Sequence, residues 1–183
     1  FRRFVADEGL TGAMIPALTA AEKEEGVEAA KRLTRKIAAA LILANTLIIA
    51  IGLVFTPYIV RIFANDFAAD PAKMALTVEM TRWLLPFLVM VSFVSLFEGL
   101  LNFRGHFFIP KLAPGLVSVG FILSAFVLGT SFTEPAWALV VGCLVGGVAH
   151  LLINLPKLWQ LWGPVGFSFS FRNDPRFQRV LRE

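Results

Sequence analysis

Residues 83–114 read WLLPFLVMVSFVSLFEGLLNFRGHFFIPKLAP, and this stretch decides the fold. Its first part is an apolar run of membrane length that a single acid, Glu98, interrupts. A short basic corner with Arg104, His106 and Lys111 follows, and a second apolar run begins after it. An apolar run of about 20 residues is long enough to cross a bilayer as a helix. The stretch therefore predicts a transmembrane helix, a tight turn at the lipid headgroups and a returning helix.

The composition of the 183 residues is that of a membrane protein. Only 16% of the residues are charged and 57% are hydrophobic, whereas a soluble domain carries about 25% charged residues. Such a chain has too little polar surface to cover a globule in water. We therefore predict an all-α integral membrane protein that folds as a helical bundle.

Four charge-poor runs and one mixed N-terminal run predict the membrane helices. The clearest is the run from Ile37 to Val60, which has no charged residue over 24 positions and would reach about 36 Å as a helix. Asp70 and Pro71 predict the start of a short helix ahead of the next span, because Asp favours the N-cap and Pro the first turn. The predicted membrane helices lie near residues 3–21, 37–60, 81–103, 112–133 and 136–157, with a charged connector at 22–36 and a cytoplasmic or interfacial tail at 158–183.

Lysine and arginine gather in alternate loops. The connector 22–36 and the tail 157–183 hold five each and the corner 104–111 holds two, whereas loops 61–82 and 129–135 hold three and none. Short loops rich in Lys and Arg stay in the cytoplasm, so the connector, the corner and the tail are predicted to be cytoplasmic. The net charge of +4 could suit nucleic acid or anionic lipids. Because the Lys and Arg residues lie at the ends of apolar runs, we expect membrane lipids as partners and not nucleic acid.

Glu98 is the sharpest candidate for a functional residue. An acid inside a membrane span costs about 2.5 to 3.5 kcal/mol on insertion scales, and such residues commonly serve a function. The alternative is structural, because Glu98 lies near enough to the basic corner to reach water or to pair with Arg104. The sequence leaves both interpretations open. Arg2 and Arg3 are likewise either anchors that snorkel to the interface from a helix start or residues of a cavity.

The remaining polar residues predict no catalytic or metal-binding set. The single cysteine, Cys143, excludes a disulfide framework and a thiolate metal site, and His106 and His150 have no partner at ligand spacing. The sequence has no Ser-His-acid spacing, phosphate-binding Gly loop or His-Glu metal motif. We therefore expect no enzymatic activity, no metal and no cofactor. Gly142 and Gly146 form a small-xxx-small pair that is typical of close helix packing.

Three separated motifs resemble those of the MurJ (MviN) family of lipid II flippases. FRRFVADEGLTGAMIPALTAAE, residues 1–22, resembles the motif of the family's second helix. TPYIVRIFANDF, residues 56–67, resembles the end of its third helix and the loop that follows. LLNFRGHFFIPKLAPGLVS, residues 100–118, resembles the family pattern LN-x3-RF-x-(I/L)P. The motifs occur in the family's order, and the resemblance covers the whole chain.

The resemblance implies an inner-membrane transporter of the MOP exporter superfamily, in which two MATE-like helical lobes enclose a central cavity. This chain would supply the second to sixth helices, a partial N-terminal bundle, and its structural partner would be the first helix and the second bundle. The implied function is to flip lipid II, the undecaprenyl-pyrophosphate-linked peptidoglycan precursor, across the bacterial inner membrane by alternating access, and the fragment alone would be inactive. Two other classes stay open: a MOP-type exporter of drugs or polyprenyl-linked oligosaccharides, and a non-transporting membrane scaffold for cell-wall enzymes.

The resemblance also bears on single residues. The family's cavity arginine in the second helix falls on the pair Arg2 and Arg3, with Arg2 the better match, which implies that Arg2 binds the pyrophosphate of the substrate. This chain has one more residue between the arginines and the following Glu-Gly pair than the commonest family pattern, so Arg3 stays the second candidate. Glu98 and Lys111 stand where the family has small or apolar residues, and neither inherits a family role.

Overall fold

The computed structural model describes residues 8–64 and 70–168, and this part of the chain is built from helices without strands. The helices in chain order are α1 (Glu8–Glu25), α2 (Val27–Phe63), α3 (Pro71–Phe103), α4 (Phe108–Leu112), α5 (Pro114–Leu128) and α6 (Ala136–Trp162). Four stretches are long and apolar enough to cross a membrane: α2, α3, α4 together with α5, and α6. The prediction of an all-α, multi-pass membrane protein is confirmed.

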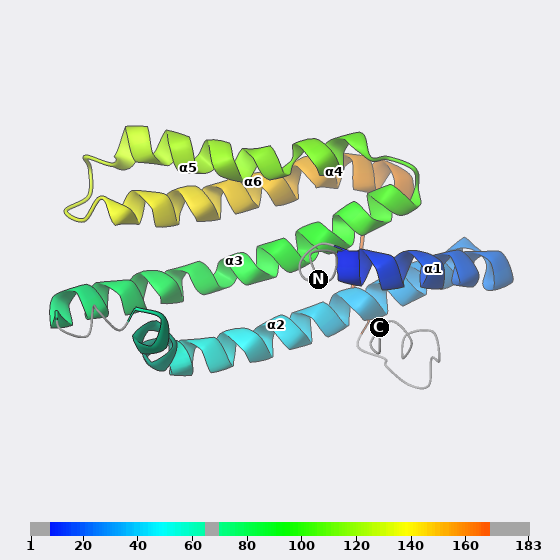
Figure 1. Cartoon of the computed structure of the whole chain (residues 1–183). Helices are drawn as coiled ribbons and strands as arrows, with labels where there is room; N and C mark the ends of the chain where they lie inside the picture. The colour runs from blue at the N-terminus through cyan, green and yellow to red at the C-terminus, as the bar shows by residue number, and fades with distance from the viewer. Residues whose placement is uncertain (1–7, 65–69, 169–183) are drawn as a thin grey trace.

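The helices lie in two antiparallel pairs (Figure 1). α2 packs on α3, α5 packs on α6, and α3 joins the pairs through its contact with α6. α1 packs on α2 and α3 at the end of the molecule where α2 begins and where α3 and α6 end. We call this the basic end, and it holds Lys23, Lys31, Arg32, Arg35, Lys36, Arg104, Lys111 and Lys157. Arg61, Lys73 and Arg82 lie in the opposite half.

A single residue, Gly26, joins α1 to α2. Its φ of 84° lies in the left-handed region, which glycine adopts without the steric penalty of a Cβ. A Cβ at Gly26 would meet no atom within 4 Å, so the backbone conformation and not the available space favours glycine. The chain doubles back at this residue, and the predicted connector 22–36 is divided between the end of α1 and the first turns of α2.

α3 begins where the sequence predicts a helix start. Oδ1 of Asp70 accepts hydrogen bonds from the backbone N–H groups of Ala72 and Lys73 at 3.1 and 3.2 Å, and Pro71 is the first helical residue. The helix then continues to Phe103 without a break, and does not form a short helix followed by a separate span. Its 33 residues reach about 50 Å, so it extends beyond the hydrocarbon core of about 30 Å.

Other helix bounds differ from the predicted spans for local reasons. The span expected at 112–133 corresponds to α5, which begins at Pro114 and ends at Leu128, and α4 forms largely within the predicted corner 104–111. Pro114 has no N–H to continue the helical ladder of α4, so a new helix begins there. α6 extends beyond the expected residue 157 to Trp162, and Gly163 with φ 79° follows it. α1 overlaps the expected membrane helix at 3–21, but its charged last turn keeps it out of the four apolar spans.

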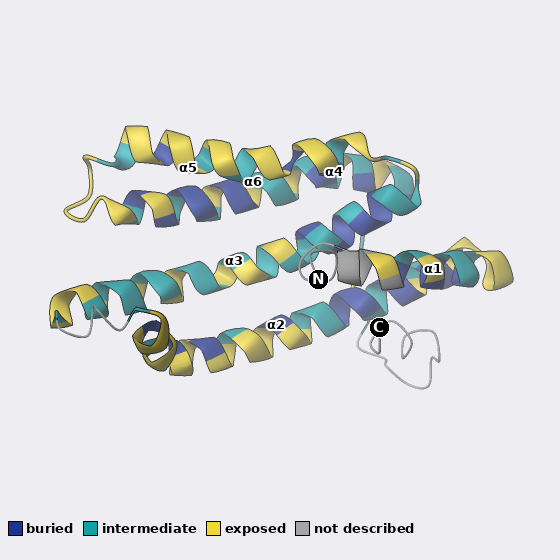
Figure 2. Ribbon diagram, viewed as in Figure 1, coloured by how far each residue is buried: buried dark blue, intermediate teal, exposed yellow. Residues whose placement is uncertain are grey.

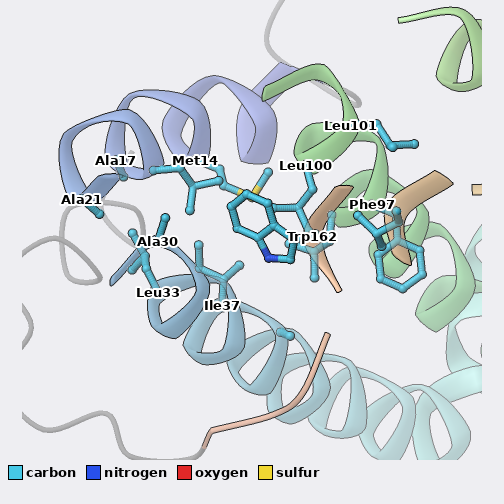
Figure 3. Packing of buried hydrophobic residues seen from close by; sticks show 14 of the residues in the cluster. Met14, Ala17, Ala21, Ala30, Leu33, Ile37, Phe97, Leu100, Leu101 and Trp162 are labelled. Atoms are coloured by element: carbon cyan, nitrogen blue, oxygen red, sulfur yellow. The ribbon is translucent and has the colours of Figure 1, made fainter. Parts of the chain in front are cut away.

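The apolar core lies at the basic end, where four helices meet. Figure 2 shows buried residues gathering where α1 lies against α2 and α3, while α5 and the outer face of α2 are largely exposed. In Figure 3, Met14 of α1, Leu100 of α3 and Trp162 of α6 converge above α2. The cluster of buried residues comprises Met14, Ala17, Leu18, Ala21, Ala29, Ala30, Leu33, Ile37, Ala38, Leu96, Phe97, Leu100, Leu101, Leu158 and Trp162.

α5 and α6 pack through small residues. A Cβ on Gly146 would lie 2.7 Å from Cα of Val117, and a Cβ on Gly142 would lie 2.7 Å from the carbonyl oxygen of Gly120. These distances are too short for any side chain, because the neighbouring atoms belong to the backbone of α5. The predicted role of Gly142 and Gly146 in close helix packing is confirmed.

A polar contact joins α2 to α3 midway along the pair. Oγ of Ser92 donates to Oδ1 of Asn45 at 3.1 Å, and Nδ2 of Asn45 donates to the carbonyl oxygen of Leu41 at 2.8 Å. Asn45 is buried, and both ends of its amide have a partner. The contact therefore satisfies an amide that would otherwise be costly to bury.

Candidate functional site

The predicted site residues Arg2 and Arg3 lie outside the described residues, which begin at residue 8. Their role stays a prediction. The third candidate, Glu98, lies in α3 on the face that packs against α6.

The carboxylate of Glu98 lies against the imidazole of His150, on α6. Oε1 of Glu98 is 2.9 Å from Nε2 of His150, and the two side chains are only 17% and 13% exposed. A hydrogen bond at this distance offsets part of the cost of removing both groups from water. The sequence offered Arg104 as a structural partner of Glu98. In the structure, His150 lies against Glu98, and Arg104 pairs with Glu22.

Asn154 lies one turn beyond His150 on α6 and is fully buried. Its Nδ2 donates to the carbonyl oxygen of His150 at 3.0 Å, whereas its Oδ1 is buried with no hydrogen-bond partner among the described residues. His150 and Asn154 thus place two polar side chains inside an otherwise apolar span. Such residues mark the face of a membrane helix that is turned toward protein.

Arg104 follows the last residue of α3 and joins three helices at the basic end. Its Nη1 donates to Oε1 of Glu22, on α1, at 2.9 Å. The guanidinium carbon lies 4.7 Å from the ring centre of Trp162, on α6, and 5.1 Å from that of Phe103. The aromatic rings favour a cation over their faces, and the carboxylate adds a charge-assisted hydrogen bond. The guanidinium is therefore held in one orientation.

A cavity of about 450 Å³ opens beside this cluster. Its wall combines the charged side chains of Glu22, Lys23 and Arg104 with the polar side chains of Thr19 and Asn102. Ile15 and Phe103 complete the lining. The cavity lies between α1 and the end of α3, and it offers positive charge and hydrogen-bond donors beside apolar surface.

The described residues place charged and polar side chains beside apolar surface in this cavity. Among them, no three His, Cys, Asp or Glu side chains gather as metal ligands. The sequence reasoning did not single out Glu22 and Asn154, and it considered His150 only as a metal ligand. A signal existed for the two α6 residues, because they interrupt an apolar run on one helix face. Glu22 carried none, since it belongs to a run of charges typical of a solvated segment.

Comparisons with known proteins point to one family. The model of the family described as lipid II flippase MurJ matches residues 1–183. Lipid II flippase MurJ of Burkholderia cenocepacia is 31% identical over 157 residues, which cover 86% of this chain and 30% of that protein. Probable lipid II flippase MurJ of Rhizobium tropici is 30% identical over 185 aligned positions, covering 99% of this chain and 34% of that protein. This chain spans about a third of the length of these relatives.

Proposed function

Because the chain belongs to the lipid II flippase MurJ family, we propose that it is part of a transporter that flips lipid II across the bacterial inner membrane by alternating access. Lipid II is here the undecaprenyl-pyrophosphate-linked peptidoglycan precursor. The observation that carries the proposal is the family match over all 183 residues, supported by four helices able to cross a membrane. The proposed role is that of a transporter and not of an enzyme.

The chain supplies part of one lobe in this proposal. It spans about a third of its relatives, and the cavity of an alternating-access transporter lies between two bundles. The chain alone is therefore expected to be inactive. In reconstituted vesicles it should fail to move a fluorescent lipid-linked precursor that the full-length protein moves, and translocation by the chain alone would contradict the shared cavity.

The basic end is proposed to face the cytoplasm. It gathers most of the described Lys and Arg residues, as the positive-inside rule requires of cytoplasmic loops. Single cysteines test this orientation in a Cys143→Ala background, with Lys31→Cys and His106→Cys at the basic end and Asp70→Cys and Thr133→Cys at the other. A periplasmic label should reach only positions 70 and 133, and any other pattern overturns the orientation.

Arg2 is proposed to hold the pyrophosphate of the substrate. A guanidinium is always charged and binds phosphate with two parallel hydrogen bonds, which lysine cannot reproduce. Consecutive residues of a helix point about 100° apart, so only one of Arg2 and Arg3 can face a cavity squarely. In the full-length protein we expect Arg2→Ala and Arg2→Lys to abolish flipping and Arg3→Ala to be milder. Normal complementation by Arg2→Lys would show that Arg2 is an interfacial anchor.

Glu98 is proposed as a further residue that binds substrate. The alternative is that it only helps α3 pack on α6 through its contact with His150. Glu98→Gln separates the two, because glutamine keeps a hydrogen-bonding oxygen for His150 but removes the charge. Normal flipping by this variant would leave Glu98 with the packing role. Loss of flipping with an unchanged melting temperature would give it the functional role.

A leaflet-specific lipid II assay on cells depleted of the full-length protein decides the function. A flippase predicts that lipid II accumulates in the cytoplasmic leaflet and that the cells lyse. An exporter of drugs or other polyprenyl-linked oligosaccharides predicts neither outcome. A scaffold for cell-wall enzymes predicts misplaced wall synthesis with normal translocation, so either of these results would refute the proposal.

A further inference from the structure

We propose that the cavity between α1 and the end of α3 binds the phosphate group of a lipid at the basic end of the protein. The site consists of Arg104, Lys23 and Asn102, with Thr19 beside them. It is separate from the predicted role of Arg2, which lies outside the described residues. The inference needs the chain to be in a membrane and does not need it to flip a substrate.

The donors of this cavity are largely unused. A guanidinium has five N–H groups, and among the described residues Glu22 is the single acceptor that Arg104 reaches. Nε of Arg104 is buried with no partner in the described part of the chain and is closed to an incoming group, so the donors that the cavity can offer belong to the 25% of this side chain that stays exposed. The exposed lysine Lys23 and the amide of Asn102 also have no hydrogen-bond partner among the described residues. The cavity therefore offers donors of three chemical kinds to one incoming group.

The charges favour an anion. Arg104 and Lys23 contribute two positive charges to the wall, and Glu22 contributes one negative charge. Oε1 of Glu22 is engaged with Nη1 of Arg104 at 2.9 Å, whereas Oε2 of Glu22 is buried without a partner among the described residues. A phosphate would therefore meet the exposed edge of the guanidinium, away from this carboxylate. Trp162 and Phe103 lie over the guanidinium and hold it in place. A pre-oriented guanidinium loses little freedom when it binds, which favours a planar fork to phosphate oxygens.

The walls favour a lipid over a free ion. Ile15 and Phe103 give the cavity an apolar side, which a free phosphate ion would leave unused. The volume of about 450 Å³ falls within the range of small-molecule sites, roughly 300 to 1,000 Å³. A phosphate ester with a short apolar stem fits both the polar and the apolar part of this wall.

Two lipids could supply this chemistry: a membrane phospholipid and a prenyl diphosphate. The test uses the full-length protein in detergent and measures dissociation constants by native mass spectrometry. The probes are a short-chain phosphatidylglycerol, farnesyl diphosphate and, as the phosphate-free control, a short-chain diacylglycerol. Lys23→Gln is the test variant, because Lys23 is exposed and takes no part in the cluster around Arg104. Lys31→Gln is the matched control, since it removes the same charge at the same end but outside the cavity.

Lys23→Gln should weaken binding of at least one phosphate-bearing probe about fivefold, the size expected of one partly exposed charge contact. Lys31→Gln should leave that constant unchanged. An effect on phosphatidylglycerol alone would identify a structural phospholipid site, and an effect on farnesyl diphosphate alone would identify a site for the transported lipid. Equal effects of the two variants, or an equal loss of diacylglycerol binding, would overturn the proposal.

Arg104→Lys gives a second test with a different basis. Lysine keeps the charge but loses the fork and the flat contact with Trp162, so the affected probe should bind more than tenfold more weakly. The melting temperature without lipid separates this loss from a loss of folding. Unchanged binding by Arg104→Lys in a folded protein would contradict the role of the guanidinium.

Discussion

The α5–α6 hairpin and the basic end hold helices together by opposite means. In the hairpin, backbone atoms meet over Gly120, Gly142 and Gly146, while most large side chains of α5 point outward. At the basic end, side chains from four helices fill a core. Arg104 pairs there with Glu22 and lies against two aromatic rings.

The difference follows from the solvent on each side. Lipid tails are as apolar as leucine, so helices inside the bilayer gain little by burying apolar side chains and associate through close packing of small residues. The basic end is proposed to lie near the headgroups, where water is available and burial of apolar surface together with paired charges becomes favourable. The two regions should therefore respond differently to matched substitutions in the full-length protein.

The largest effect is expected at the glycine contact. Gly146→Ala would place a Cβ 2.7 Å from Cα of Val117, and a backbone atom cannot move aside without separating the helices. We expect the free energy of unfolding in detergent to fall by about 2 kcal/mol, as for an overpacked core. Gly115→Ala is the control, because a Cβ at Gly115 meets nothing within 4 Å. A similar loss in both variants would show that the small-residue contact is not what holds α5 on α6.

A smaller effect is expected for the ion pair at the basic end. Arg104→Ala removes the partner of the half-buried Glu22 and the contact with Trp162, and we expect a loss of about 1 to 2 kcal/mol. Arg32→Ala is the matched control, because Arg32 pairs with Glu25 at 3.6 Å where both side chains are more than half exposed. That pair should contribute less than about 0.5 kcal/mol. Equal losses in chemical denaturation would mean that burial and aromatic contact add nothing to the Arg104 pair.

The smallest effect is expected from the two buried asparagines. Asn45→Leu removes the hydrogen bond from Ser92 that joins α3 to α2, although Ser92 keeps its bond to the carbonyl oxygen of Leu88. We expect this loss to cost about 1 kcal/mol. Asn154→Leu removes an amide whose Oδ1 has no partner among the described residues, so stability should be unchanged or slightly higher. Melting temperatures of the two variants measure the difference. A greater loss for Asn154→Leu would indicate that Oδ1 has a partner in the full-length protein.

The sequence predicts the helices well because each depends on neighbours along the chain. The charge-free run from Ile37 and the cap formed by Asp70 and Pro71 are local signals, and the structure has a helix at each. The close packing at Gly142 and Gly146 can also be predicted from the sequence, since four-residue spacing places both on one helix face.

The site contacts could not be predicted in the same way. Glu98 meets His150 across 52 residues, and Arg104 meets Glu22 across 82 residues. The partner in each contact depends on how helices are rotated and shifted against one another, which no local pattern fixes. Arg104 is the partner that the sequence indicates for Glu98, because both lie near the end of one helix. The rotation of α6, which turns His150 toward α3, decided the outcome.

A rotation of α1 about Gly26 would displace the two ends of this helix by different amounts. α1 has 18 residues and a length of about 27 Å, and a single glycine ties it to the longest helix of the described structure. A rotation of about 10° at this pivot would swing the far end of α1 through roughly 5 Å, by the geometry of a rigid helical rod. The ion pair of Glu22 lies within about one turn of the pivot, where the same rotation moves atoms by only about 1 Å. The buried side chains of Met14 and Leu18 lie between these two points of α1, so such a rotation would also have to move them within the core.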